Sequence, residues 1–206
     1  MKDFSIEKLS ELTAANSASP GGGSVSALAG AYAASLACMV AKLTQGKKGY
    51  ETVDKEMMQI DQEAEALRLK LLDQIARDAS SFDAFMAALR MPKGSDEEKA
   101  ARSKQMQDAL RQACEVPLET AIWSLGALRL ALECVRTGNA NAASDGYVGA
   151  LMARSSVLGA LSNVRINLAG ISDPAFSKEM KTACMRIEEE ARALEREAEA
   201  AFSSRI

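Results

Sequence analysis

The stretch VDKEMMQIDQEAEALRLKLLDQIARDASSFDAFMAALR, residues 53–90, decides the fold because it runs without a glycine or a proline. Its apolar residues return every three or four positions, which is the spacing that lines one face of an α-helix. A helix of that length would span about 55 Å at 1.5 Å per residue. The stretch therefore favours an all-α, single-domain bundle of long antiparallel helices over residues 1–206.

The rest of the chain continues this periodicity between short breaks rich in glycine, proline or asparagine. The expected helices cover residues 4–16, 24–44, 53–90, 95–137, 144–168 and 173 onward. Ser24 and Ser144 are the expected N-caps of the second and fifth helices. Pro117 lies inside the fourth helix, so we expect a kink or a break near Glu115.

The composition is that of a globular helical protein. Apolar residues make up 48% of the 206 residues and charged residues 26%, while aromatic residues make up only 4%. Alanine is abundant and β-branched runs are rare, which argues against an all-β fold. No tandem repeat or low-complexity linker divides the chain.

The chain has no histidine, which excludes every mechanism that needs an imidazole. Ser-His-Asp and Cys-His catalysis, HExxH zinc hydrolases and His-ligated haem are therefore ruled out. Proton transfer near neutral pH must fall to Asp, Glu, Lys, Cys or Tyr groups with shifted pKa values. The net charge of −3 and the lack of a basic arm argue against nucleic acid as a partner.

The cysteines indicate a reducing compartment. They form no CxxC pair and lie in helical, mostly apolar stretches, at Cys38, Cys114, Cys134 and Cys184. We expect free, buried thiols in a cytoplasmic protein rather than disulfides. Residues 1–13 alternate charged and apolar residues at helical spacing, unlike a secretory signal.

Residues 25–41 carry no charge and consist mainly of Ala, Gly and Ser. A membrane-associated bundle built on this segment is one alternative. The segment lies at the short edge of the spanning range, however, and its small residues insert weakly, so a buried core helix is favoured. Because small side chains let another backbone come close, we expect this helix at the centre of the bundle or at a subunit seam.

Two glycine-rich segments offer places for an anionic ligand. Pro20-Gly21-Gly22-Gly23-Ser24 precedes a helix, where backbone N–H groups and the helix dipole suit an anion or a polarised carbonyl. Lys47 and Lys48 lie between two glycines and could hold a carboxylate or phosphate tail. A flexible turn and a solvated basic turn are the corresponding structural alternatives.

Asp78 is the candidate acid/base group. It lies one helical turn from both Ile75 and Phe82, on or beside the apolar face of its helix, whereas Asp83 is expected to be exposed. A carboxylate beside an apolar face is desolvated, which raises its pKa. Because the chain has no histidine, this is the position at which we expect general acid/base chemistry. A structural ion pair is the alternative.

Short polar side chains gather in two further places. Asn139, Ser144 and Asp145 surround one helix start, where capping explains the serine and part of the aspartate. Asn163 and Asn167 are four residues apart on one helical face. If that face is buried, both amides need hydrogen-bond partners, either a polar heterocycle or a neighbouring helix.

Together these segments resemble the cyclodeaminase domain of formiminotransferase-cyclodeaminase and the stand-alone bacterial methenyltetrahydrofolate cyclohydrolases. The resemblance is carried, in order along nearly the whole chain, by residues 19–24, 46–50, 78–82, 91–93, 97–99, 116–118, 138–139, 144–145 and 163–167. The formiminotransferase part has no counterpart here. Residues 140–142 and Ser80 depart from the family pattern, which bears on the shape of the pocket and not on the aspartate.

The resemblance implies an all-helical homodimer that acts on a tetrahydrofolate derivative without a metal or a further cofactor. It assigns the acid/base role to Asp78. Pro20–Ser24 are expected to offer backbone N–H groups, and Lys47 and Lys48 to meet the glutamate tail of a polyglutamylated folate. The residues expected to hold the pterin or orient water are Asn139, Ser144, Asp145, Asn163 and Asn167.

Two reactions fit this resemblance. A cyclohydrolase adds water to the methenyl bridge between N5 and N10 of tetrahydrofolate and opens it to the 10-formyl form. A cyclodeaminase closes N10 onto a formimino carbon and expels ammonia. We predict hydrolysis, because ammonia release normally follows formimino transfer by a second domain. A folate-binding helical dimer without turnover is the non-enzymatic alternative.

Overall fold

The computed structural model describes residues 4–205, which form helices joined by short connections and contain no strand. The α-helices are α1 (Ile6–Ala14), α2 (Gly22–Thr44), α3 (Asp54–Leu89), α4 (Asp96–Thr137), α5 (Ala143–Leu168) and α6 (Pro174–Ser203). Two 3₁₀ turns precede α3 and α5, namely η1 (Glu51–Val53) and η2 (Ala140–Ala142). The prediction of an all-α, single-domain bundle of long helices is confirmed.

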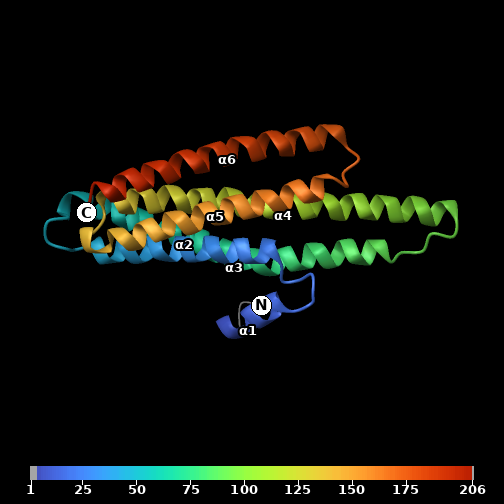
Figure 1. Cartoon of the computed structure of the whole chain (residues 1–206), viewed down its shortest axis with the longest axis horizontal. Helices are drawn as coiled ribbons and strands as arrows, with labels where there is room; N and C mark the ends of the chain where they lie inside the picture. The colour runs from blue at the N-terminus through green and yellow to red at the C-terminus, as the bar shows by residue number, and fades with distance from the viewer. Residues whose placement is uncertain (1–3, 206) are drawn as a thin grey trace.

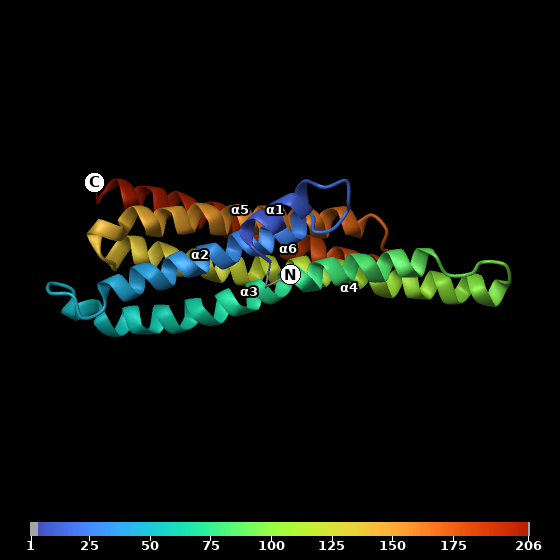
Figure 2. The same cartoon turned by 90° about the horizontal axis from the view of Figure 1, so that it is seen from below.

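The long helices α2 to α6 lie lengthwise along one axis, with α6 on one side of the bundle and the short α1 on the opposite side (Figure 1). The joined ends of α3 and α4 project beyond the other helices at one end (Figure 2). The loop after α2 lies at the other end. Because α2 and α3 are antiparallel, the first turn of α2 lies beside the C-terminal half of α3.

The small residues of α2 allow it to occupy the centre of the bundle, where it packs against α3, α4 and α5. A Cβ atom at Gly30 would lie 2.4 Å from Ser124 Oγ and 2.8 Å from Ser156 Oγ, so no larger residue fits there. Ser156 donates a hydrogen bond to the carbonyl oxygen of Ser26 at 2.6 Å. This buried bond ties α5 to α2.

By length and composition α2 could also cross a membrane, since its most apolar window has a mean hydropathy of 1.6. However, 61% of that window is buried inside the bundle. The apolar character of α2 is therefore used mostly in contacts with other helices, and the prediction of a core helix is confirmed.

The start of α2 differs from the prediction. The helix begins at Gly22 with Gly21 as its N-cap, so Ser24 is the third helical residue rather than the cap. Its hydroxyl group donates a hydrogen bond to Asp78 on α3 instead. The prediction is wrong because the hydroxyl group of Ser24 bonds to a residue 54 positions away and not to the backbone of its own helix start.

The start of α5 differs as well. The 3₁₀ turn η2 leads directly into α5, which begins at Ala143, so Ser144 is an exposed residue of the first turn and not its cap. The side chain of Asn139 caps the preceding η2 turn by accepting a hydrogen bond from the N–H group of Asn141.

α4 continues through Pro117, so of the kink or break predicted near Glu115 the break does not occur. A proline has no N–H group, which leaves the carbonyl oxygen of Ala113, four residues earlier, without its helical donor. Asn167 of α5 donates its Nδ2–H to that oxygen at 2.7 Å. This bond satisfies the buried oxygen and explains how the helix accommodates the proline.

The starts of α4 and α6 agree with the prediction. Ser95 and Glu98 form a reciprocal capping box at the start of α4. Asp173 caps α6 immediately before Pro174, which occupies the first helical position. α1 ends at Ala14, two residues earlier than expected. The four cysteines are buried and free, as expected.

Candidate active site

Asp78 lies on α3 against the first turn of α2. Ser24 Oγ is 2.8 Å from Asp78 Oδ2 and 3.2 Å from the carbonyl oxygen of Ile75. Ser24 is 2% exposed, whereas Asp78 is half-buried. A buried hydroxyl group therefore holds the carboxyl group against the N-terminus of α2.

Gly23 permits this close approach. A Cβ atom at Gly23 would lie 2.0 Å from Asp78 Oδ1 and 2.5 Å from Asp78 Cγ, well inside any allowed contact. A Cβ atom at Gly22 would meet only Asn163 Nδ2, at an ordinary 3.6 Å. Of the two helical glycines, Gly23 is thus the one that the position of the carboxyl group requires.

Burial raises the pKa of Asp78 above its ordinary value, because the loss of water disfavours the charged form. Hydrogen bonds from Ser24 lower the pKa and offset this effect only in part. The direction agrees with the prediction from the apolar neighbours of Asp78, and Asp83 is exposed as expected. A carboxyl group whose pKa moves toward neutral pH is suited both to accept and to donate a proton.

A cavity of about 200 Å³ opens beside Asp78, between the first turn of α2 and the facing parts of α3, α4 and α5. Its polar lining includes Asp78, Asn163 and Asn167, and its apolar lining includes Phe85 and Leu110. Among the described residues that line it, Asp78 alone is charged. Leu110 was missed by the sequence reasoning, because nothing distinguishes one apolar residue of a long helix as facing a cavity.

The amide nitrogen atoms of Asn163 and Asn167 each donate a hydrogen bond to a backbone carbonyl oxygen. Asn163 Nδ2 donates to the carbonyl oxygen of Gly159 at 2.9 Å, and Asn167 Nδ2 to that of Ala113. Within residues 4–205, neither amide oxygen accepts a hydrogen bond from the protein. These oxygens remain as acceptors for a polar ligand in the cavity.

The other predicted site residues lie at the opposite end of α2. Lys47 Nζ donates to Asn139 Oδ1 at 2.6 Å, while Lys48 and Ser144 are exposed and Asp145 is half-buried. Because α2 holds 23 residues, its two ends are about 35 Å apart. The structure therefore does not bring this group to the Asp78 cavity within one chain.

Asn139 is engaged in the structure at every polar atom of its side chain. Its Nδ2 donates to the carbonyl oxygen of Leu43 at 3.2 Å, and its Oδ1 accepts from Lys47 and from the Asn141 N–H group. Its backbone N–H donates to Thr44 Oγ1 at 2.8 Å. These bonds fasten the η2 turn to the end of α2, which gives Asn139 a structural role.

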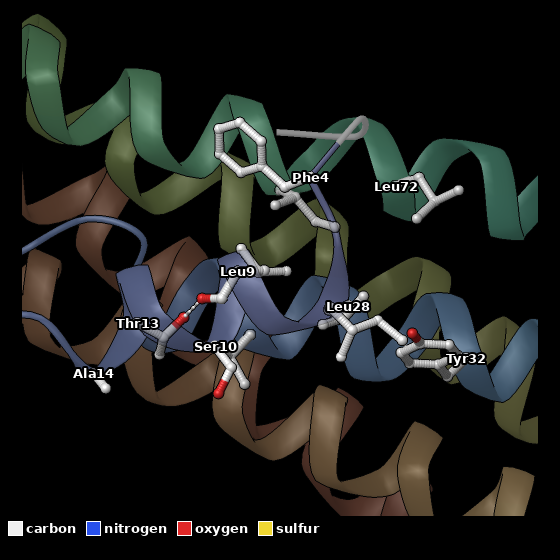
Figure 3. Close-up of a pocket in the computed structure, with 11 residues that line it drawn as sticks. Phe4, Leu9, Ser10, Thr13, Ala14, Leu28, Tyr32 and Leu72 are labelled. Carbon is white, nitrogen blue, oxygen red and sulfur yellow. Dashed lines mark hydrogen bonds between the residues drawn. The ribbon is translucent and has the colours of Figure 1, made fainter.

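A larger pocket of about 530 Å³ lies between α1 and the outer faces of α2 and α3 (Figure 3). Its lining is mainly apolar, with Phe4, Leu28 and Leu72 among the side chains shown, and no acidic or basic side chain lines it. This pocket therefore differs from the smaller cavity, whose lining includes the Asp78 carboxyl group. Among residues 4–205, no three His, Cys, Asp or Glu side chains gather as a candidate metal site.

Known proteins are similar in sequence to this chain over most of its length. A family model described as formiminotransferase-cyclodeaminase matches residues 5–186. A methenyltetrahydrofolate cyclohydrolase from Methylorubrum extorquens is 40% identical over 174 residues, which are 84% of this chain and 84% of that protein. A formimidoyltransferase-cyclodeaminase from Gallus gallus is 36% identical over 181 residues, which are 85% of this chain and 32% of the longer protein.

The fold is shared as well. The crystal structure of a formiminotetrahydrofolate cyclodeaminase from Thermotoga maritima matches with a TM-score of 0.89 at 30% identity and covers 98% of both chains. Fold and site together define an all-helical domain of the kind found in folate enzymes, with one partly buried carboxyl group in a small cavity. The chain belongs to the formiminotransferase-cyclodeaminase family, which confirms the resemblance carried by its motifs.

Proposed function

We propose that the protein hydrolyses 5,10-methenyltetrahydrofolate to 10-formyltetrahydrofolate, with Asp78 as the acid/base group. The observation that carries this proposal is the desolvated Asp78 carboxyl group in a cavity whose other lining residues are uncharged. Similarity to a methenyltetrahydrofolate cyclohydrolase over most of both chains supports the choice of reaction. The folate is the substrate, and the proposal involves no metal or further cofactor.

The reaction needs one group that moves protons in both directions. As water attacks the methenyl carbon and a C–O bond forms, the Asp78 carboxylate takes a proton from the water. Asp78 then returns this proton to N5 as the C–N5 bond breaks, and the remaining hydroxyl proton passes to solvent as the formyl group forms on N10. A carboxyl group with a raised pKa performs both steps.

The residues around Asp78 would hold the ring portion of the substrate. The cavity of about 200 Å³ is smaller than the roughly 300–1,000 Å³ of most ligand sites, so the remainder of the folate extends outside it. Asn163 and Asn167 would accept hydrogen bonds from the pterin through their amide oxygens. Within Pro20–Ser24, the three glycines line the cavity and would place backbone N–H groups near the reacting carbon.

Cyclodeamination is the second candidate, favoured by the match to a cyclodeaminase structure over 98% of both chains. In that reaction Asp78 would take the proton from N10 as the N10–C bond forms. It would then deliver the proton to the amino group that leaves as ammonia. Both reactions use the same carboxyl group, so the site geometry does not separate them.

An absorbance assay of the purified protein on two substrates in parallel decides between them. With 5,10-methenyltetrahydrofolate, a cyclohydrolase makes the methenyl absorbance disappear faster than in buffer alone. With 5-formiminotetrahydrofolate, a cyclodeaminase makes the same absorbance appear. We expect loss with the first substrate and no gain with the second. A folded protein that binds folate and is silent with both substrates would contradict the proposal and favour a binding function.

We propose that the protein is a homodimer joined through the outer side of α2. Val25, Tyr32 and Met39 are spaced seven residues apart on this helix, with Leu43 one turn further on, and they are between 36% and 49% exposed. A continuous apolar stripe on a helix surface is typical of a helix–helix interface. Two copies related by a two-fold axis would cover each other's stripe.

We propose that Lys47 and Lys48 bind the anionic glutamate tail of a polyglutamylated folate. In an antiparallel pair of α2 helices, the C-terminal end of one α2 lies beside the start of its partner, which brings these lysines toward the neighbouring Asp78 cavity. Replacing both by Ala should weaken the binding of polyglutamylated folate and reduce its salt dependence, while the monoglutamate binds as before. Unchanged affinity for the polyglutamylated form would refute the tail site.

We further propose a cytoplasmic location without a nucleic-acid or membrane partner. The free, buried thiols support a reducing compartment, and the net charge of −3 offers no field that attracts phosphate backbones. The burial of most of the apolar window of α2 supports the absence of a membrane partner.

A further inference from the structure

The hydroxyl group of Ser24 has one proton and faces two acceptors. Its oxygen lies 2.8 Å from Asp78 Oδ2 and 3.2 Å from the carbonyl oxygen of Ile75. The geometry points to Ser24 as a positioning residue that keeps the Asp78 carboxyl group in one orientation in both its ionised and its protonated form. This inference rests on the proposed acid/base role of Asp78.

The two forms differ in the direction of the hydrogen bonds and not in the positions of the heavy atoms. When Asp78 is ionised, the Ser24 hydroxyl donates to Oδ2. When Asp78 is protonated, its own O–H donates to Ser24 Oγ, and the Ser24 hydroxyl turns to donate to the carbonyl oxygen of Ile75, which has a lone pair to spare. A proton can therefore arrive and leave without rotation of the carboxyl group.

The packing around the group fixes the same orientation. Oδ1 lies against Gly23, close enough that a Cβ atom there would be 2.0 Å away. Ser24 is 2% exposed, so bulk water does not replace its hydroxyl as the partner of Oδ2. Each carboxyl oxygen thus has its own neighbour on the first turn of α2.

Ser24 also lowers the pKa of the Asp78 carboxyl group through its hydrogen bonds. The parts of α2, α4 and α5 that line the cavity contribute glycines, Leu110, Ala113 and the two asparagines, none of which titrates. On α3 the cavity is lined by Ser81 and two phenylalanines beside Asp78. Because no charged side chain among the described residues of the cavity lining faces Asp78, the hydrogen bonds from Ser24 are the interactions that oppose the rise in its pKa caused by burial.

The test is the pH dependence of methenyltetrahydrofolate hydrolysis by Ser24→Ala. A hydrogen bond to an ionised carboxylate is stronger than one to the neutral acid, so its loss raises the pKa of Asp78 further. We expect the acid limb of kcat/KM to move to higher pH by about one unit, and kcat to fall more than KM rises. Ser24→Thr, which keeps the hydroxyl group, should restore the position of the limb.

Ser26→Ala is the matched control. Ser26 is also buried on α2, but its hydroxyl donates to the carbonyl oxygen of Gly22 and not to Asp78. This variant loses a buried hydroxyl from the same helix, and we expect it to keep the wild-type pH profile. A general weakening of α2 would instead affect both variants alike.

A titration of the Asp78 carboxyl carbon by ¹³C NMR in the wild type and in Ser24→Ala provides a readout that does not depend on turnover. Identical pKa values for Asp78 in the two proteins, with identical acid limbs, would overturn the role of Ser24. Substantial activity in Asp78→Asn would refute the proposed acid/base function instead. In that case the NMR titration still shows whether Ser24 controls the carboxyl group.

Discussion

At the scale of single residues, the site depends on a carboxyl group and a glycine that fit together. Asp78 Oδ1 occupies space that any side chain at position 23 would take. At position 23, the second residue of α2, glycine leaves this space free, because a Cβ atom there would displace the carboxyl group.

Gly23→Ala tests this fit. The added methyl group must push Asp78 out of position, so we expect the hydrolysis rate to fall by roughly 100-fold, as for a misplaced catalytic group. The fold should persist because alanine favours the helix. Gly22→Ala adds the same methyl group one residue earlier, where its nearest contact is 3.6 Å, and should lose far less activity. Equal losses in both variants would contradict the account.

The character of Asp78 could be predicted from its own neighbours, because an apolar helix face desolvates whatever lies beside it. Its contact with Ser24 could not, since it joins residues 54 positions apart and depends on the register between α2 and α3. Helical periodicity indicates which face of a helix is buried but not which residue of another helix it meets.

At the scale of helices, the pairing of α4 with α5 resolves a conflict within the sequence. Pro117 should interrupt a helix, and yet α4 runs through it because Asn167 supplies the missing donor to Ala113. The spacing of Asn163 and Asn167 indicates a polar helix face. Only the packing shows that their amide N–H groups bond to protein carbonyl oxygens while both residues line the cavity.

The bond between Asn167 and Ala113 predicts a coupling between two positions on different helices. Asn167→Ala leaves a buried carbonyl oxygen without a donor and should lower the free energy of unfolding by about 1–3 kcal/mol. In a Pro117→Ala background, the restored backbone N–H satisfies that oxygen, so the same substitution should cost much less. Urea unfolding of the four proteins in the double-mutant cycle measures the difference. Equal costs in both backgrounds would contradict the assigned role of Asn167.

The ends of α2 illustrate what the sequence leaves undetermined at this scale. Candidate binding residues lie near both ends, and the resemblance implies that they hold different parts of one folate molecule. The structure separates Asp78, Asn163 and Asn167 from Lys47 and Asn139 by the length of the helix. Sequence motifs give the composition of a site but not the distances between its parts.

At the scale of the whole molecule, the bundle leaves an apolar stripe of its central helix partly exposed. α1 lies over the beginning of this side without burying any of its own residues (Figure 3). The stripe continues beyond α1 to Met39 and Leu43. The proposed dimer would cover this surface and bring the basic end of α2 to the neighbouring cavity.

Met39→Glu tests this interface. A charge on the stripe would have to be buried on association, which is unfavourable, so we expect the variant to be monomeric at micromolar concentration. Light scattering after size-exclusion chromatography gives the mass directly. Met185→Glu is the control, since Met185 is 62% exposed on α6, away from the stripe. Dimerisation of the wild type and of Met39→Glu to the same extent would rule out this face.

The central claim is that Asp78 moves the protons of the reaction, and the rate of methenyltetrahydrofolate hydrolysis by Asp78→Asn tests it most directly. Asparagine keeps the shape of the side chain but neither accepts nor donates the proton. We expect kcat to fall by about 10²- to 10⁴-fold, while folate affinity and the melting temperature stay close to those of the wild type. Retention of most of the wild-type rate in a folded, folate-binding variant would contradict the mechanism.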